Sequence, residues 1–215
     1  MAAAAACNRV LELQSDFFET FHLCVEKVLS IGRSSEVVLA SSIQDLSHKR
    51  AVKKISLKGE DLQARELSVK EAKALFHREI EILRILDHPN IIGGVNGVLS
   101  PDYMALSMEF CPNGTLVTHL KKMTNGLIDR YFDGLVSAVC YIHSHRIVHG
   151  NIKLQNIFVN AKNKAVLADF SCSYKMPENV SYVKTAGVTM AYLSPEVLMK
   201  RSKVDPFKVR LSDTF

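Results

Sequence analysis

The sequence predicts an α+β fold in two lobes: a five-stranded antiparallel sheet with one helix, then a mainly helical lobe. Strand patterns around a single helical pattern fill the first half of the chain, and helical patterns with short strands fill the second. A turn-forming Cys-Pro-Asn-Gly run at 111–114 separates them. We therefore expect an N-terminal extension over residues 1–20, a first lobe over 21–110 and a second over 111–215.

Short alternating or β-branched segments predict the strands of the first lobe. Turn-forming or polar residues separate them at 32–35, 44–48 and 100–102. The predicted strands are Phe21–Ser30, Glu36–Ser42, Lys49–Ser56, Ile91–Leu99 and Tyr103–Phe110. The first three are expected to form an antiparallel meander.

One helix is predicted between the third and fourth strands, over about Leu67 to Leu86, because Pro89 disfavours helix in the residue before it. At 100° per residue, seven apolar side chains of this helix fall within one arc: Ala72, Leu75, Phe76, Ile80, Ile82, Leu83 and Leu86. Glu79 falls in the middle of that arc. Burying its carboxylate alone would be costly, so either a cationic partner meets it or it reaches an edge and stays hydrated.

The third predicted strand offers a partner for Glu79. Period-2 alternation places Ala51, Lys53 and Ile55 on one face of this strand and Val52 and Lys54 on the other. A lysine within an apolar strand face and a glutamate within an apolar helix face make a plausible ion pair.

Two helices are predicted after the linker, over Thr115–Met123 and about Gly126–Ser144.

The composition excludes several other classes of protein. Hydrophobic residues make up 47% and charged residues 23%, and the net charge of +5 is scattered, so no nucleic-acid partner is expected. The five cysteines show no C-x-x-C spacing, which argues against a disulfide framework or a zinc site. No stretch approaches 18 apolar residues, so we expect a cytoplasmic protein with no membrane span.

Six short motifs follow one another along the chain. They are Ala51–Lys53, Arg78–Ile80 with His88–Ile91, Met108–Cys111, His149–Asn156, Asp169–Ser171 and Ser194–Glu196. In this order they resemble the V-A-I-K strand, the αC helix and its exit, the hinge, the H-R-D-L-x-x-x-N catalytic loop, D-F-G and A-P-E of the eukaryotic protein kinase domain. The resemblance runs from about Phe21 to Phe215, and Lys153 is similar to the serine/threonine type.

The resemblance implies an ATP and Mg²⁺ site. Lys53 would hold the α- and β-phosphates and be oriented by Glu79, while Asn156 and Asp169 would bind the metal. The adenine would lie between Val37 and Ala51 on one side and Phe158 on the other, with its edge bonded by the backbone of Glu109 and Cys111.

The chain departs from the kinase pattern at the glycine-rich loop. The positions that would read G-x-G-x-x-G-x-V hold Ser30, Gly32, Ser35 and Val37. Only Gly32 survives, so we expect a looser phosphate clamp.

The larger departure is Asn151, which occupies the position of the catalytic aspartate. Its amide can orient a substrate hydroxyl but cannot accept its proton, so phosphotransfer is expected to be weak or absent. Gly150 replaces the neighbouring arginine that would pair with a phosphate on Thr185. Ser171 replaces the D-F-G glycine, which restricts the backbone while leaving the metal ligand intact.

The last residues, Leu211–Phe215, resemble the start of the central helix of a kinase C-lobe, so a C-terminally truncated domain is expected. The leading hypothesis is a pseudokinase that binds ATP and Mg²⁺. A slow serine/threonine kinase that uses Lys153 and the metal without a base is the second hypothesis. A scaffold or allosteric protein partner with no nucleotide role is the third.

Overall fold

The computed structural model describes residues 21–32, 35–58, 62 and 67–176 of the chain. These residues divide into two compact units. The first unit takes the described residues up to Phe76 together with Gly94–Phe110, and the second takes His77–Gly93 and the described residues from Cys111 onward.

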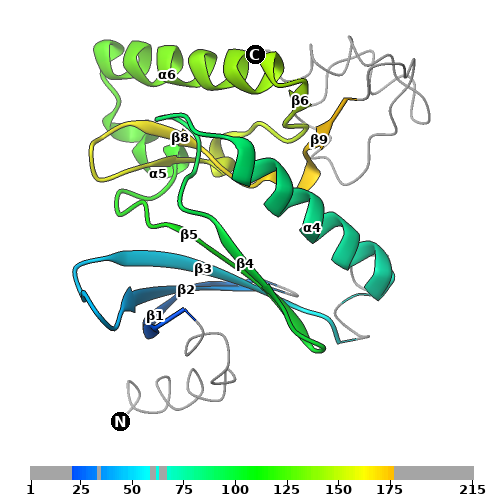
Figure 1. Cartoon of the computed structure of the whole chain (residues 1–215). Coiled ribbons are helices and arrows are strands. Elements are labelled where there is room, and N and C mark those ends of the chain that lie inside the picture. Colours follow the sequence, from blue (N-terminus) through cyan, green and yellow to red (C-terminus); the bar gives the residue numbers. More distant parts are fainter. Residues whose placement is uncertain (1–20, 33–34, 59–61, 63–66, 177–215) are drawn as a thin grey trace. The chain divides into compact units, whose positions relative to one another are not determined.

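The first unit is built on a five-stranded antiparallel sheet, seen in blue to green in Figure 1. Its strands lie in the order β1-β2-β3-β5-β4, so the first three form the predicted meander. Their bounds are β1 Leu23–Ile31, β2 Ser35–Ser42, β3 Lys49–Ser56, β4 Asn96–Leu99 and β5 Tyr103–Glu109.

The two faces of this sheet follow from its register. Val52 pairs with Val38 on β2 and with Ser107 on β5, which places all three side chains on one face. This face carries a buried cluster of Leu23, Val38, Ala40, Val52, Tyr103 and Ala105. The opposite face carries Ala51, Lys53 and Ile55, as the alternation predicts.

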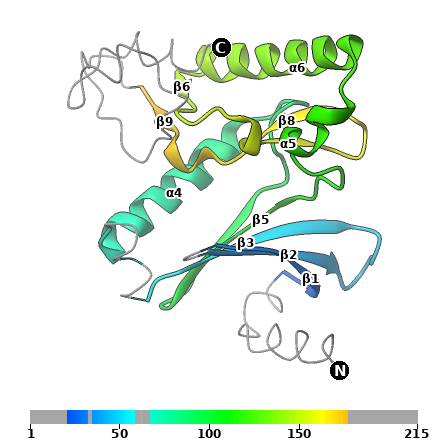
Figure 2. The ribbon, with the colours of Figure 1, turned by 180° about the vertical axis from the view of Figure 1, so that it is seen from behind.

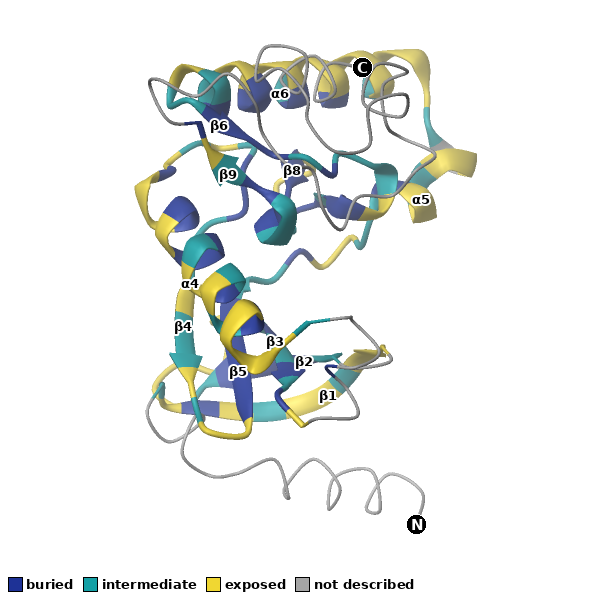
Figure 3. Cartoon of the chain, turned by 90° about the vertical axis from the view of Figure 1, so that its right-hand side faces the viewer, coloured by how far each residue is buried: buried dark blue, intermediate teal, exposed yellow. Residues whose placement is uncertain are grey.

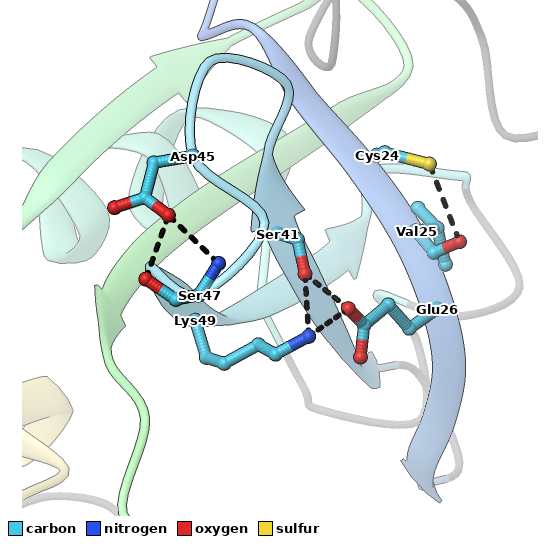
Figure 4. A network of polar contacts seen from close by, with 7 residues as sticks. All are labelled: Cys24, Val25, Glu26, Ser41, Asp45, Ser47 and Lys49. Atoms are coloured by element: carbon cyan, nitrogen blue, oxygen red, sulfur yellow. Dashed lines mark hydrogen bonds and ion pairs between the residues drawn. The ribbon is translucent and has the colours of Figure 1, made fainter.

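Two sets of polar contacts stabilise the β1–β3 meander (Figure 4). One joins the three strands through Glu26, Ser41 and Lys49, and the other closes the β2–β3 loop. The Lys49 ammonium and the Ser41 hydroxyl both donate to the carboxylate of Glu26, and Lys49 Nζ also lies 2.9 Å from Ser41 Oγ. In the β2–β3 loop, Asp45 Oδ1 accepts from the Ser47 hydroxyl at 2.6 Å and from the Ser47 N–H at 2.9 Å. The loop is therefore closed by its own side chains.

Helix α4 spans Val69–Ile85 and confirms the predicted helix. A capping box begins it: Glu71 Oε2 accepts from the Ser68 hydroxyl and N–H, and Ser68 Oγ accepts from the Glu71 N–H. The predicted apolar arc is buried at Ala72, Phe76, Ile80, Ile82 and Leu83, while Leu75 is half-buried. Leu86, the last member of the arc, is buried just beyond the helix.

The predicted strand over Ile91–Leu99 is wrong in its first half. Only Asn96–Leu99 forms β4, while Ile91 makes an isolated bridge to Leu167 of the second unit. Gly94 has φ +64°, a conformation that breaks an extended strand and favours glycine. The chain therefore leaves the second unit at residue 93 and joins the sheet only at Asn96, after residues without regular secondary structure.

The longest helix of the described residues is α6, Asn125–Ser144, in the second unit, and it confirms the second predicted helix. The first prediction, Thr115–Met123, resolves into a short α5, Leu116–His119, and a 3₁₀ turn η1, Leu120–Lys122. One side of α6 is buried and the other exposed (Figure 3). Its buried side chains recur at helical spacing: Tyr131, Leu135, Ala138, Val139 and Ile142.

Short irregular elements complete the second unit (Figure 2). They are β6 Ile147–Val148, η2 Leu154–Asn156, β7 Ile157–Val159, β8 Ala165–Leu167, η3 Phe170–Cys172 and β9 Tyr174–Lys175. β7 pairs with β8 and β6 with β9, both antiparallel. Across the described ranges, no helix is long and apolar enough to cross a membrane.

Candidate active site

Three of the predicted nucleotide-binding residues share one face of the first unit's sheet. Lys53 pairs directly with Val37 on β2, and Ala51 lies two residues earlier on β3, so all three side chains project from the same side. Lys53 is half-buried. The structure therefore brings together the apolar pair and the cation that the sequence singles out.

Glu109 is the last residue of β5 and lies opposite Arg50 in the register. The Arg50 side chain donates from Nε to Ser107 Oγ at 3.0 Å and from Nη2 to the Gly94 carbonyl. Burial lowers the pKa of the Arg50 guanidinium, and the charge of Glu109 opposes this effect. Arg50 therefore fixes the end of β5 to the segment entering β4. The sequence alone does not single out Arg50, because alternation does not show which side chain an arginine meets.

Gly32 stands at the tip of the β1–β2 hairpin. Its N–H donates to the Ser35 carbonyl at 2.7 Å, and a Cβ at this position would lie 3.0 Å from Ser35 Oγ. The Gly32 amide is therefore already bonded to Ser35, and a side chain at this position would displace the Ser35 hydroxyl.

Glu79 lies in the second unit, on the part of α4 that belongs there, and is only 3% exposed. This burial argues against the second of the two alternatives, a carboxylate that reaches an edge and stays hydrated. Its predicted partnership with Lys53 joins residues of different units and stays a prediction.

His149 holds the loop that follows β6. Its Nδ1 lies 3.2 Å from the Asn151 N–H and accepts from it, so Nε2 carries the proton and donates to the Ala168 carbonyl at 3.1 Å. The ring also packs edge-on against Phe170, with centroids 4.6 Å apart. His149 and Phe170 are fully buried. One imidazole thus connects the loop containing Asn151 with the segment that leads to Asp169.

Hydrogen bonds to the backbone connect Asn156, one predicted metal ligand, with the residue before Asp169, the other. Asn156 donates from Nδ2 to the Asn151 carbonyl at 2.9 Å, and its own carbonyl accepts from the Ala168 N–H at 2.9 Å. Ala168 directly precedes Asp169. Asn151 and Asn156 are both buried, at 8% and 6% exposure. The bond from Nδ2 leaves the Asn156 amide oxygen, the atom a metal would use, as an acceptor.

Asp169 has an unusual backbone, with φ 64° and ψ 68° in the left-handed region. Asp169 directly precedes η3, whose first residue, Phe170, is buried. Ser173, just after η3, donates from both N–H and hydroxyl to the Phe170 carbonyl. The Ser171 hydroxyl donates to Asp169 Oδ1 at 2.9 Å.

Cys172, the last residue of this turn, is half-buried, and its surroundings shift the pKa of its thiol. Burial raises the pKa of its thiol and the Asp169 carboxylate raises it further; Ser171 lowers it, Glu79 raises it and Lys153 lowers it. The thiol therefore stays protonated at neutral pH.

Gly150 has φ +76°, and a Cβ there would lie 3.1 Å from the Cys172 carbonyl oxygen. The sequence analysis considered Gly150 only as a lost arginine. The structure adds a steric reason for glycine, since the loop and the η3 turn approach each other closely at this residue.

Cys111 and Phe158 lie on adjoining backbone of the second unit. Phe158 is the centre of β7 and is bridged to Thr115, while Asn113 and Gly114 exchange backbone bonds with Val159. Cys111 is buried, and its carbonyl accepts from the Gly114 N–H. Lys153 stands just before η2 in extended conformation and is half-buried.

The donor set fits magnesium in a restricted way. Asn156 and Asp169 supply an amide and a carboxylate oxygen, the hard ligands that Mg²⁺ prefers. Among the described residues, no group of three or more His, Cys, Asp or Glu side chains could hold a metal. Two protein oxygens suit an ion that completes its shell with water and phosphate oxygens. Thr185, Ser194–Glu196 and Leu211–Phe215 lie outside the described residues.

The sheet of the first unit, the His149–Asn156 loop and the Asp169–Ser171 turn define a two-lobed kinase fold. The chain belongs to the protein kinase domain family, whose model matches residues 24–209.

The chain is similar to several protein kinases. The chain is 30% identical over 186 residues to "Carbon catabolite-derepressing protein kinase" of Secale cereale, covering 84% of this chain and 35% of that protein. It is 30% identical over 139 residues to "Mitogen-activated protein kinase kinase kinase 13" of Pongo abelii, covering 63% and 14%. It is 27% identical over 183 residues to "Serine/threonine protein kinase OSK3" of Oryza sativa subsp. indica, covering 84% and 35%. The chain thus spans about a third or less of the length of these relatives.

Proposed function

We propose that this kinase-like domain binds ATP with Mg²⁺ and transfers the γ-phosphate to protein serine or threonine poorly. One observation carries the proposal: the Asn156 and Asp169 side chains are both held by hydrogen bonds, while the residue between them and His149, at the base position, is Asn151. The chain therefore has the two residues proposed to bind the metal but lacks a proton acceptor at the base position.

The residues assigned to the adenine follow from the kinase resemblance. They are Val37 and Ala51 for one face, Phe158 for the other, and the backbone of Glu109 and Cys111 for its edge. The shared face of Val37, Ala51 and Lys53 supports this assignment, because it places an apolar surface beside a cation. Lys53, oriented by Glu79, would hold the phosphates.

The metal would be bound by Asn156 and Asp169, and it would neutralise charge on the phosphate oxygens. The amide oxygen of Asn156 is set by its Nδ2 bond to the Asn151 carbonyl. The Asp169 carboxylate is set by the left-handed backbone and by Ser171.

Asn151 explains the expected weakness of transfer. Its amide oxygen can accept a hydrogen bond from a substrate hydroxyl, but an amide has no useful basicity. Positioned general bases contribute about 10²- to 10⁴-fold to rate. Lys153 would still neutralise charge on the transferred phosphoryl group, which allows slow transfer without a base.

A second candidate function is a protein-binding role that needs no nucleotide. The Gly32 N–H, which a phosphate would need, is bonded to the Ser35 carbonyl within the hairpin. A stable hetero-complex that ignores ATP and survives Lys53→Met would favour this role. The cytoplasmic location and the lack of a nucleic-acid partner stay predictions from composition.

Thermal unfolding of the 215-residue chain with ATP and Mg²⁺ tests nucleotide binding. A ligand at 100 times its Kd stabilises the folded state by about 2.7 kcal/mol. In a chain of this size, that energy raises the midpoint by about 5 to 11 °C. Asp169→Asn should remove the part of the rise that needs Mg²⁺, and Asp45→Asn, on the first unit's loop, should not. A midpoint that ignores ATP with and without Mg²⁺ would contradict the proposal.

A further inference from the structure

The side chain of Arg50 reaches across the first unit's sheet. It starts on β3, donates from Nε to Ser107 Oγ on β5 at 3.0 Å, and donates from Nη2 to the carbonyl of Gly94, two residues before β4. These strands are neighbours in the order β3-β5-β4 (Figure 1). One guanidinium therefore joins β3, β5 and the segment that leads into β4.

This contact lies where the β4–β5 pairing ends. The last pair of that ladder is Asn96–Ser107. β5 continues to Glu109, and its pairing with β3 continues to the pair Arg50–Glu109. The bonds from Arg50 to Ser107 and Gly94 carry the link between β5 and the β4 side past the last ladder pair. They therefore add a restraint on the end of β5 to the one that β3 provides.

Two features of the chain suit this contact. The planar guanidinium fork presents donors that reach two separate acceptors, which the single ammonium of a lysine does less well. Gly94 leaves room for the fork, because with φ +64° a Cβ there would lie 2.5 Å from Arg50 Nη1. Ser107 is only 2% exposed, so its bond with Nε is partly shielded from water.

Arg50 lies on the face of the sheet opposite to the residues proposed to meet ATP. By strand alternation, Arg50 and Ser107 share the face of Val52. Ala51 and Lys53 project from the other face. Arg50 would therefore act on a nucleotide through the backbone of β5 and not by direct contact.

We propose that Arg50 is a positioning residue for the nucleobase: by joining Ser107 to Gly94, it holds the backbone of Glu109 in place to bond the edge of adenine. The proposal rests on the proposed function, in which that backbone bonds the base. Adenine presents an amino donor beside a ring-nitrogen acceptor, whereas hypoxanthine presents a carbonyl beside an N–H. A fixed backbone discriminates against the reversed pattern, because its polar groups would be left unpaired. Arg50 thereby contributes to selectivity for adenine.

The first test compares ATP with inosine triphosphate (ITP), whose base is hypoxanthine. Thermal unfolding of the full chain is followed while each nucleotide is titrated with excess Mg²⁺, which gives a Kd for each. A typical hydrogen bond changes an equilibrium constant by about 2- to 10-fold. Arg50→Ala should therefore raise the Kd for ATP by about 3- to 10-fold and the Kd for ITP by less than about 2-fold. Arg84→Ala, in the exposed last turn of α4, is the matched control and should change neither.

A second variant disrupts the same contact from the other side. Gly94→Ala places a Cβ 2.5 Å from Arg50 Nη1, so it should change the ratio of the two Kd values in the same direction while keeping the arginine. Gly93→Ala is its control, because a Cβ there would meet no atom within 4 Å, and it should leave the ratio unchanged. If Arg50→Ala does not fold, this pair of variants decides.

Amide hydrogen exchange of the free chain tests the contact without any nucleotide. Exchange over residues 94–97 and 107–110 should quicken in Arg50→Ala, because both segments lose a restraint. Arg84→Ala should not change exchange there. Unchanged exchange in Arg50→Ala would show that the contact does not hold the end of β5 and would overturn the proposal.

The outcomes separate this proposal from the proposed function. If the unsubstituted chain binds ATP more tightly than ITP and Arg50→Ala changes both Kd values equally, or neither, the proposal is wrong while nucleotide binding stands. Equal affinity of the unsubstituted chain for ATP and ITP would also overturn it. If the unsubstituted chain binds neither nucleotide, the proposed function fails and the role of Arg50 at the base fails with it.

Discussion

The site residues of the two units are positioned by different means. In the first unit, Val37, Ala51 and Lys53 share a face because a regular antiparallel register repeats every two residues. In the second unit, Asn151, Asn156 and Asp169 lie on irregular backbone held by side chains and left-handed residues. A regular sheet tolerates changes at single positions better than a loop whose conformation depends on each bond. Substitutions in the second unit should therefore cost more.

The largest expected effect is at Phe170, which is fully buried and packs against His149. Phe170→Ala should lower the free energy of unfolding by about 3 to 5 kcal/mol, because it removes a buried apolar ring and leaves a cavity. Chemical denaturation followed by circular dichroism measures this loss. Phe132→Ala, on the exposed side of α6 at 49% exposure, is the control and should cost far less. Equal losses would show that the turn is not a packed element.

Gly150 is expected to rank second. Gly150→Ala places a Cβ at φ +76° and 3.1 Å from the Cys172 carbonyl, so it should cost about 1 to 3 kcal/mol. Gly126→Ala is the matched control, because its Cβ would meet no atom within 4 Å in α6. That control should be neutral or gain up to about 1 kcal/mol. If Gly150→Ala were as stable as Gly126→Ala, the steric reason for glycine in the loop would be wrong.

How far the sequence predicts each part follows the same division. Alternation predicts the face of Lys53 and helical periodicity places Glu79 within the apolar arc of its helix, since both depend on regular geometry. Neither periodicity shows that Ile91 bridges Leu167, that Gly150 approaches Cys172, or that Ser171 bonds Asp169. Those contacts join loop residues whose dihedral angles no repeat determines. Motif resemblance identified the loop residues, and only the structure shows how they are held.

The smallest of the expected losses of stability is at Arg50, which represents the first unit in the comparison with Phe170 of the second. Arg50→Ala removes the donors to Ser107 Oγ, in a part-buried hydrogen bond, and to the exposed Gly94 carbonyl, and should cost about 1 to 2 kcal/mol. Arg84→Ala, in the last turn of α4, is the exposed control. Unfolding by urea compares them. A loss at Arg50 larger than that at Phe170 would reverse the ranking of the two units.

The measurement that tests the central claim most directly is phosphate transfer from ATP to a serine/threonine peptide by the unsubstituted chain and by Asn151→Asp. Both preparations should first show a rise in the unfolding midpoint with ATP and Mg²⁺. We expect Asn151→Asp to raise the transfer rate by about 10²- to 10⁴-fold, since it restores a proton acceptor. Asn151→Ala should give no gain, and Asp169→Asn in the Asn151→Asp background should abolish it. An unsubstituted chain that already transfers phosphate as fast as Asn151→Asp would contradict the account.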